Sequence, residues 1–373
     1  MEAKAVMKRL ILLLVGAIAV SAGGCGPSLL PSDPPNPKTA ASQGRSDWQV
    51  LGQDRPVLGV DLYALSNYSP AQVEFYGRRA LSYIKNVLKA DAVGIVWNFY
   101  SPDPYMDTLQ ATNATLSASN VEILTKIADQ DHLLVEYRPL ILVTGDAPTK
   151  WEGQITPYQT AGWFNNYYRL ELPYLKIAQQ YGVREFVTGT ELQALNSSSQ
   201  WPSFFARVAR VYHGVISYSS WDGDYFGVSP GTPFQSARPQ LLPAKYIGMD
   251  MYWHMNISAS ATAAQVTAAW ESLFSKMPLS VLRRTAIDET GIQARAGAYS
   301  NPQALDEPGA ESDQVQANWF TAACSTVRRY DMRGVFFFKV DLTDNPAHPA
   351  TSLSTFEGKA GAKAIGRCAR ILR

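Results

Sequence analysis

From residue 56 onward, short apolar runs alternate along the chain with longer stretches in which apolar residues recur every three or four positions. The short runs are rich in β-branched and aromatic residues and predict strands, whereas the longer periodic stretches predict amphipathic helices. Eight strands are expected, over residues 57–63, 92–97, 133–138, 185–190, 215–218, 246–252, 285–288 and 334–340. Ser69 and Pro70 open the first helix, and further helices are expected over residues 121–128, 163–181, 201–212, 263–274, 315–330 and 362–371.

Strands that alternate with helices indicate a parallel sheet with helical crossovers. Eight such units over residues 56–373 predict a single-domain α/β fold, a (β/α)₈ TIM barrel. The competing fold is an open doubly wound sheet, which usually has a glycine-rich phosphate-binding turn after its first strand. Residues 61–66 contain no glycine, so the barrel is favoured. The helical pattern is weakest over residues 219–245, which are rich in glycine and proline.

The N-terminus has the pattern of an export signal. Lys4, Lys8 and Arg9 precede an apolar run over residues 10–20, and small residues then lead to Cys25. The run is about half the ~20 residues that a membrane-spanning helix needs. Residues 1–25 are therefore predicted to be a lipoprotein signal peptide that ends in a lipobox with lipidation at Cys25. Lipoboxes usually carry Leu where this chain has Ala22, so simple secretion is the alternative.

Residues 26–55 are rich in proline and poor in large apolar side chains, which predicts a disordered tether between the anchor and the barrel. The expected location is the cell envelope, with the membrane as a partner through the lipid anchor. Lys and Arg number 33 against 32 Asp and Glu, so no nucleic-acid partner is expected. No protein partner, metal or other cofactor is predicted. Cys324 and Cys368 either form a disulfide or remain two thiols.

Two glutamates occupy the positions where a barrel places its chemistry. Glu191 ends the fourth predicted strand and Glu289 ends the seventh. Active sites of TIM barrels lie at the C-terminal ends of the strands, and strands four and seven lie on opposite sides of the mouth. Retaining glycosidases need such a pair of carboxyl groups, roughly 5–5.5 Å apart, as acid/base and nucleophile. Glu191 and Glu289 are therefore the candidate catalytic residues.

Several stretches in this order resemble Glycoside Hydrolase Family 113 of clan A, best known for β-mannanases. The matching stretches are residues 137–140 (YRPL), 151–155 (WEGQI), 163–167 (WFNNY), 187–192 (VTGTEL), 246–252 (YIGMDMY) and 288–291 (DETG). The resemblance covers most of residues 57–340. It implies that Glu191 is the acid/base and Glu289 the nucleophile of a double-displacement reaction on a β-linked polysaccharide, most of all a mannan, or an envelope glycan.

The resemblance and the strand ends together suggest further substrate-binding residues. Tyr252 matches an aromatic residue near the family's nucleophile and is expected to hydrogen-bond Glu289. Arg138 stands where the family's mannanases carry Lys, with a sugar contact or a structural ion pair as its two possible roles. Four other residues, near strand ends or in the loops after strands, are expected to line sugar-binding subsites. Asp61 is expected to bind substrate or to cap a loop. The four are Trp97, Asn98, Trp151 and Trp221.

Two departures from the clan pattern affect the expected substrate. Thr190 stands where most of the clan has Asn before the acid/base, and Lys339 follows two phenylalanines where the eighth strand often supplies Trp. Lys339 and Arg138 are cations that suit an acidic sugar as well as a neutral one. Two other functions share the same features: a non-catalytic glycan-binding lipoprotein, and a transglycosylase, which uses the same covalent intermediate.

Overall fold

A computed structural model of the chain describes residues 55–145, 151–226, 244, 246–304, 309–350, 352 and 354–373. The predicted signal peptide, Cys25 and nearly all of the predicted tether lie outside the described residues. No helix in the described ranges combines the length and the apolar character needed to cross a membrane.

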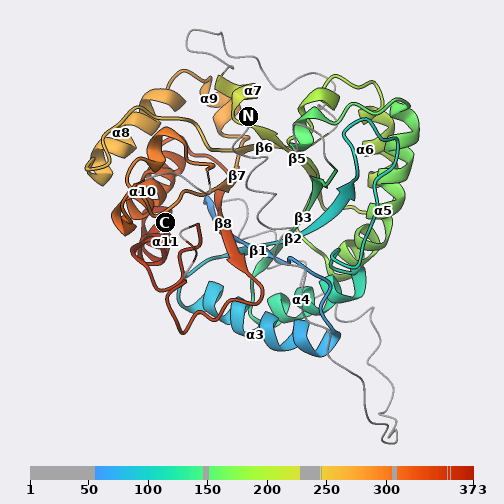
Figure 1. The fold of residues 1–373 in the computed structure, drawn as a ribbon, viewed down its shortest axis with the longest axis horizontal. Helices are drawn as coiled ribbons and strands as arrows, with labels where there is room; N and C mark the ends of the chain where they lie inside the picture. Colours follow the sequence, from blue (N-terminus) through green and yellow to red (C-terminus); the bar gives the residue numbers. More distant parts are fainter. Residues whose placement is uncertain are drawn as a thin grey trace, which may run out of the picture.

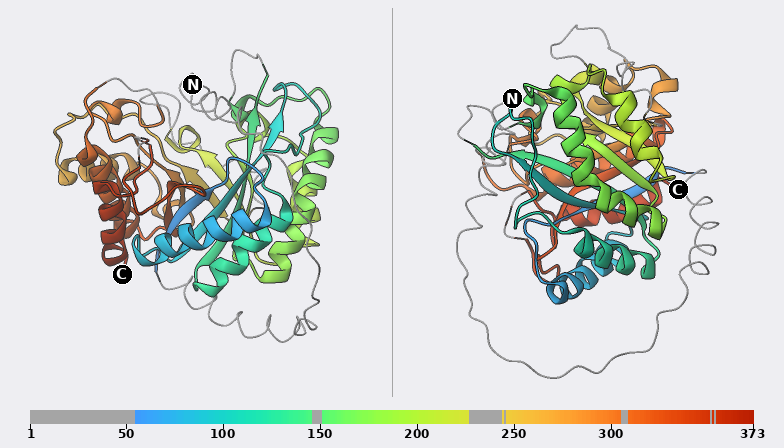
Figure 2. Two further views of the ribbon diagram at one scale, coloured as in Figure 1. Left: turned by 60° about the horizontal axis from the view of Figure 1, so that its bottom comes forward. Right: turned by 90° about the vertical axis from the view of Figure 1, so that its right-hand side faces the viewer.

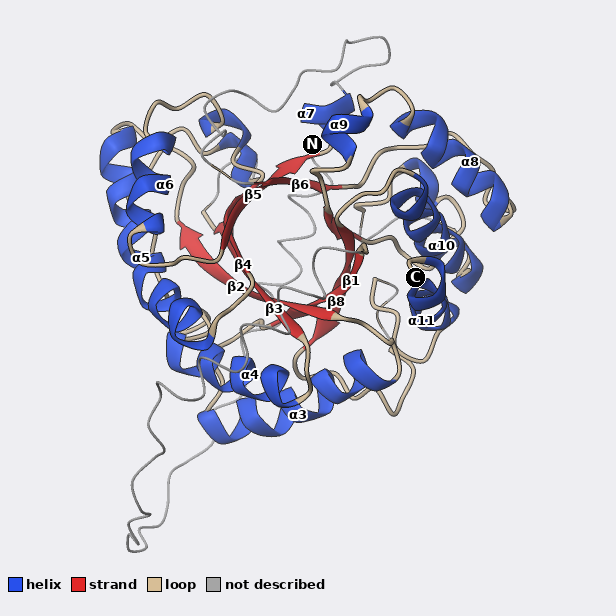
Figure 3. Ribbon diagram, turned by 180° about the vertical axis from the view of Figure 1, so that it is seen from behind, coloured by secondary structure: helices blue, strands red, loops and turns tan. Residues whose placement is uncertain are grey.

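The described chain forms a closed barrel of eight parallel strands, in the order in which they occur along the sequence. Helices surround the ring of strands, as the views along the barrel show (Figures 1 and 3). The strands are β1 (Val57–Tyr63), β2 (Ala92–Ser101), β3 (Leu134–Val143), β4 (Glu185–Thr190), β5 (Val215–Trp221), β6 (Tyr246–Asp250), β7 (Ile287–Thr290) and β8 (Gly334–Asp341). The closed ring confirms the predicted (β/α)₈ fold, and β8 pairs with β1 to complete it.

The outer helices agree closely with the periodic stretches. They are α3 (Pro70–Asn86), α4 (Ala118–Gln130), α5 (Thr160–Tyr181), α6 (Trp201–Ala209), α8 (Ala263–Phe274), α10 (Asp313–Arg329) and α11 (Ala360–Ile371). Figure 2 shows α3 and α4 side by side on the outside of the barrel. Ser69 caps α3 and Thr262 caps α8, each in a reciprocal box with a glutamine three residues on. After β5 the described chain has only the short α7 (Gly223–Phe226), where the helical pattern is weakest.

The barrel interior is built in layers. Near the N-terminal ends of the strands, four apolar side chains form one layer: Val57, Ala92, Leu134 and Phe336. Near the C-terminal ends a second apolar layer contains Tyr63, Val96, Leu140 and Phe338. Charged side chains lie between these layers, and Gly94 provides room for one of them. A Cβ atom on Gly94 would lie 2.2 Å from Asp61 Oδ1, so any larger residue there would displace the Asp61 carboxyl.

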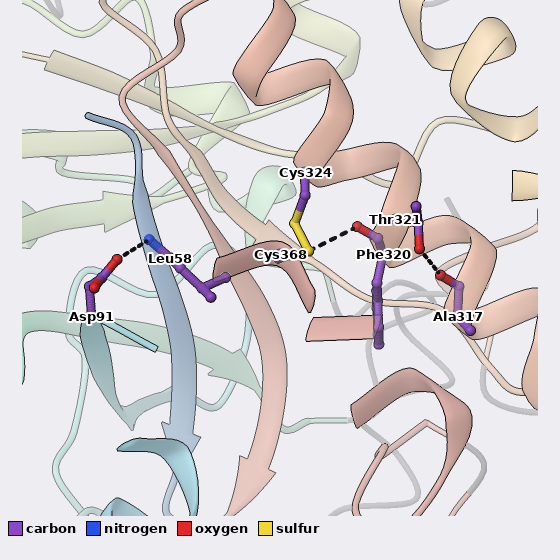
Figure 4. Close-up of a disulfide and its surroundings, with 7 residues drawn as sticks. All are labelled: Leu58, Asp91, Ala317, Phe320, Thr321, Cys324 and Cys368. Atoms are coloured by element: carbon purple, nitrogen blue, oxygen red, sulfur yellow. Dashed lines mark hydrogen bonds between the residues drawn. A yellow bond between two sulfur atoms is a disulfide. The ribbon is translucent and has the colours of Figure 1, made fainter. Parts of the chain in front are cut away.

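A disulfide joins α10 to the last helix, α11. Cys324 and Cys368 are both buried, and their Cα atoms are 5.7 Å apart (Figure 4). The sequence leaves two possibilities open for these cysteines, and the structure has the bonded one. Since α10 and α11 pack against each other, the bond reinforces a contact between the two final helices of the fold.

Candidate active site

Glu191 directly follows β4, and its backbone adopts an unusual conformation. Its φ angle is +53°, in the left-handed region that residues with side chains rarely occupy. Such a conformation costs on the order of 1–3 kcal/mol and persists where surrounding contacts fix it. Two contacts do so here: the Glu191 amide donates to the Ser219 carbonyl at 2.9 Å, and the next amide, Leu192 N–H, donates to the Tyr218 hydroxyl at 2.8 Å. The side chain of Glu191 is 1 % exposed.

A polar network behind Glu191 holds the Tyr218 hydroxyl in place. Tyr218 donates to Asn196 Oδ1 at 2.6 Å, and the Asn196 amide donates to Asp224 Oδ2 at 2.8 Å. Ser220 Oγ donates to the same Asp224 oxygen at 2.6 Å. These side chains come from β5 and from the segments after β4 and β5, so the network joins the elements on either side of Glu191. It cannot be predicted from the sequence, because none of these residues stands out by type or spacing.

The side chain of Glu191 also contacts an indole. Trp151, in the segment after β3, donates its Nε1–H to Glu191 Oε2 at 2.7 Å. The Trp151 ring meets the Trp221 ring edge-on, with centroids 5.6 Å apart. Trp151 is buried and Trp221, the last residue of β5, is partly exposed. Two of the three tryptophans that were expected to line sugar subsites, Trp151 and Trp221, therefore lie together, with Trp151 directly beside Glu191.

Glu289 lies in β7 at a point where the pairing of β7 with β6 is irregular. The Tyr252 hydroxyl donates to Glu289 Oε1 at 2.7 Å, and a nitrogen of the Arg138 guanidinium lies 3.1 Å from Oε2. Each carboxylate oxygen thus has its own partner. The carboxylate orientation is fixed by groups from β3 and from the segment after β6.

Arg138 is fully buried and is shared among several acceptors. Its guanidinium lies 2.5 Å from Asp250 Oδ1, also reaches Glu289, and donates to the backbone carbonyl of Asp288. Asp250 Oδ1 accepts a second hydrogen bond from Ser219 Oγ at 2.6 Å. Of the two roles expected for Arg138, the structure shows the ion pair. The guanidinium connects the candidate nucleophile to a second buried carboxylate.

The negative charges of Glu191 and Glu289 both raise the pKa of the Tyr252 phenol. Burial raises the pKa of the Tyr252 phenol well above its ordinary value, with the negative charge of Glu289 the next largest cause and that of Glu191 a further one. The phenol is therefore within electrostatic range of both glutamates. The two acids lie at the C-terminal ends of β4 and β7, on the side of the barrel where the active site is expected.

Trp97, which was expected to line a sugar subsite, packs instead on the outside of the barrel. It is fully buried, its ring stacks on Tyr174 of α5 with centroids 4.4 Å apart, and it meets Tyr137 edge-on. Side chains alternate along a strand, so the inward position of Asn98 turns Trp97 outward. The prediction for Trp97 is wrong because both faces of a barrel strand are buried, and an aromatic residue on either face looks the same in the sequence.

Asp61, which was expected to bind substrate or cap a loop, lies two residues inside β1. It is fully buried among the charged side chains between the two apolar layers of the barrel interior. It lies further from the C-terminal end of the barrel than Tyr63 and the apolar layer that contains Tyr63. Neither carboxylate oxygen has a hydrogen-bond partner among the described residues. Burial raises the pKa of Asp61 well above its ordinary value, although the charge of Arg138 opposes this. Neither expected role fits this position.

Asn98 and Lys339, which were also predicted to bind substrate, each have a partner within the protein. Asn98 Oδ1 accepts a hydrogen bond from the Tyr63 hydroxyl at 2.9 Å. Lys339 pairs with Asp341 at the end of β8, and its ammonium lies 4.6 Å from the centre of the Tyr63 ring. Lys339 is therefore neutralised by an acidic neighbour two residues along the chain.

Sequence reasoning did not identify Asp250 and Asp288 as parts of the site. Asp250 ends β6, and its position at the C-terminal end of a strand was the available signal. Asp288 precedes Glu289; burial raises its pKa to about 7, and the charge of Glu185 adds to this. Across the described residues, no group of three or more His, Cys, Asp or Glu side chains is arranged to hold a metal ion.

A closed parallel barrel with two buried carboxyl groups at the C-terminal ends of β4 and β7 is the architecture of a barrel-type glycoside hydrolase. The chain belongs to Glycoside Hydrolase Family 113, whose family profile matches residues 76–357. The protein is therefore a glycosidase. No curated protein sequence matches it.

Solved structures with the same fold include several mannanases. A GH113 β-mannanase from Alicyclobacillus acidocaldarius is 16% identical, with a TM-score of 0.67, and the match covers 85% of this chain and 98% of that one. A structure described as a GH113 β-1,4-mannanase is also 16% identical, with a TM-score of 0.68 and coverage of 85% and 99%. An endo-β-1,4-mannanase from Thermotoga petrophila is 10% identical, with a TM-score of 0.53 and coverage of 86% and 77%. At these identities the likeness concerns the fold.

Proposed function

We propose that the protein is a retaining glycosidase that cleaves β-1,4-linked mannan chains, with Glu289 as nucleophile and Glu191 as acid/base. The observation that carries this assignment is the different setting of the two acids. Glu289 is held by Arg138 and Tyr252, as suits a carboxylate that attacks. Glu191 lies between the indole of Trp151 and a rigid backbone turn, as suits a group that passes a proton to and from a fixed point.

The reaction follows from these positions in two steps. In the first step Glu289 attacks the anomeric carbon and forms a glycosyl ester, while Glu191 gives its proton to the departing glycosidic oxygen. In the second step Glu191 takes a proton from water, the resulting hydroxide attacks the anomeric carbon, and the Glu289 carboxylate leaves. Arg138 and Tyr252 orient Glu289 throughout and stabilise its charge when it departs.

A neutral mannan is favoured over an acidic glycan. The similar solved structures are those of mannanases. In addition, the two cations that made an acidic sugar plausible are already paired: Arg138 with Asp250 and Glu289, and Lys339 with Asp341. Binding an acidic sugar would require one of these pairs to open, whereas a neutral sugar needs only hydrogen-bonding and stacking partners such as Asn98 and Trp221.

The test of this function is the anomeric configuration of the first product. We expect the protein to release oligosaccharides from linear β-1,4-mannan, glucomannan and galactomannan, and NMR during the first minutes should show the β-anomer before mutarotation. An α-anomer as first product would contradict the double displacement. Cleavage of cellulose or xylan in preference to all three mannans would contradict the substrate assignment.

We also propose that the enzyme is exported and held in the cell envelope by a lipid on Cys25, with residues 26–55 as the tether. The proposal rests on the charged and apolar leader and on the small residues before Cys25. Replacing Cys25 by serine should move the protein from the membrane fraction to the soluble fraction of the cell envelope or the medium. A wild-type protein that never appears in the membrane fraction would leave plain secretion as the route.

A further inference from the structure

Two tyrosine rings lie exposed beside each other on segments that follow β2 and β3. Tyr105 is 51% exposed and Tyr158 is 81% exposed, and their ring centroids are 6.1 Å apart. Large apolar side chains are otherwise mostly buried in the described residues. The six exposed ones are Phe75, Val87, Tyr105, Met106, Tyr158 and Leu279, so three of the six lie on these two segments. An exposed cluster of this kind often marks a binding surface.

The backbone around the two rings is fixed by hydrogen bonds between the segments. Tyr158 N–H donates to the Tyr105 carbonyl at 3.2 Å, and Thr156 N–H donates to the Pro104 carbonyl at 2.8 Å. The Asp103 carboxylate accepts from Tyr105 N–H at 2.8 Å. The rings are therefore presented together by a preorganised surface, which lowers the entropic cost of binding a ligand across both.

The tyrosine pair lies at the same end of the barrel as the candidate catalytic acids. Both segments leave the C-terminal ends of their strands, where a barrel carries its active site. The segment with Tyr158 also supplies Trp151, the indole bonded to Glu191. Tyr158 lies seven positions after Trp151 in the chain, so their Cα atoms are at most about 25 Å apart. One polysaccharide chain several sugars long can span that distance.

The chemistry of the surface favours a neutral sugar chain. A tyrosine ring offers a flat apolar face for the apolar face of a pyranose, and its hydroxyl can hydrogen-bond sugar hydroxyls. Two acidic side chains lie beside the rings: Asp103 accepts a hydrogen bond from the backbone of Tyr105, and Asp107 accepts one from the backbone of Gln159, next to Tyr158. Their negative charge disfavours an anionic polymer. We propose that Tyr105 and Tyr158, the tyrosine platform, form a remote site that binds pyranose units of the polysaccharide while it is cleaved. This inference rests on the proposed function.

The test compares a polymer with a short substrate. The double variant Tyr105→Ala/Tyr158→Ala should lower kcat/KM for soluble galactomannan about tenfold, as expected for two lost ring contacts. Its kcat/KM for a short aryl β-manno-oligoside should stay within about twofold, because none of the described contacts of Tyr105 and Tyr158 involves Glu191 or Glu289. Phe75→Ala is the matched control, since Phe75 is 64% exposed but lies on the outer helix α3. It should change neither rate.

Affinity electrophoresis makes the test independent of turnover. Galactomannan in a native gel should retard the Glu289→Gln variant, and adding the two tyrosine substitutions should abolish most of the retardation. Unchanged polymer kinetics and unchanged retardation in the double variant would overturn the platform. A second result would also overturn the platform: the double variant elutes as a monomer in size-exclusion chromatography where the parent elutes as a dimer, and its retardation by galactomannan is unchanged. The rings would then join two copies of the chain. An equal loss on the short substrate and on the polymer in the double variant would also overturn the remote platform, because the rings would then act at the cleavage site. A wild-type protein that galactomannan retards but that cleaves neither substrate would contradict the proposed function and not the platform.

Discussion

Replacing Glu289 with glutamine should lower kcat/KM toward mannan by roughly 10⁴-fold or more, because the reaction then has no carboxylate to form the glycosyl ester. Glu191→Gln should cost about 10²–10⁴-fold on mannan, the usual range for a general acid/base. On aryl glycosides with a good leaving group, the first step needs little proton donation. Glu191→Gln should therefore slow that step far less, and a burst of released phenol should mark the accumulated ester.

Glu74→Gln on α3 is a suitable control, because Glu74 is an exposed carboxylate that pairs only with the nearby Arg78 in the described contacts. All three variants should unfold at closely similar denaturant concentrations if the losses are chemical. A Glu289→Gln enzyme that keeps even a hundredth of the wild-type rate on mannan would remove Glu289 from the role of nucleophile. Addition of azide to Glu191→Ala with an activated substrate should yield the β-glycosyl azide, which identifies the acid/base independently.

Replacing Arg138 with methionine should destabilise the fold by about 3–5 kcal/mol, because Asp250 and Glu289 would be left as buried charges without their cation. Arg138→Lys keeps the charge but cannot reach Asp250, Glu289 and the Asp288 carbonyl together, so it should lose less stability than methionine and still lose activity. Urea unfolding followed by tryptophan fluorescence measures the stability difference.

The double variant Arg138→Met/Asp250→Asn separates the lost ion pair from lost packing. Neutralising Asp250 should recover part of the stability lost by Arg138→Met, which a double-mutant cycle would record as a coupling energy. Full wild-type stability of Arg138→Met would show that the buried charges do not need the guanidinium. No recovery in the double variant would assign the loss to packing.

Much of the fold could be predicted from the sequence because strands and helices have different hydrophobic periods. The bounds of β1, β4 and α8 are those expected from the sequence. β2 and β3 run several residues further, to Ser101 and Val143, because the alternation of inward and outward side chains continues past the first polar residues. The order of the strands followed from their number and alternation, without any knowledge of contacts.

The candidate site was less accessible to sequence reasoning. The positions of Glu191 and Glu289 follow from strand order, but the pairing of Arg138 with Asp250 joins β3 to β6 across the barrel, and no sequence spacing reveals that. The outward turn of Trp97 depends on the inward or outward phase of β2, which hydrophobicity cannot give when both faces are buried. The left-handed backbone at Glu191 is set by Ser219 and Tyr218 of a neighbouring strand.

The bond between Cys324 and Cys368 has a consequence for how the enzyme withstands proteases. The two cysteines are 44 residues apart, and the loop that they close contains the whole of β8 and the long connection to α11. Exposed connections of this kind are preferred points of proteolytic cleavage. A single cut between β8 and α11 would leave both fragments covalently joined, with the final helix still seated and the ring of strands still closed. In a reducing environment the same nick would let the C-terminal helix dissociate.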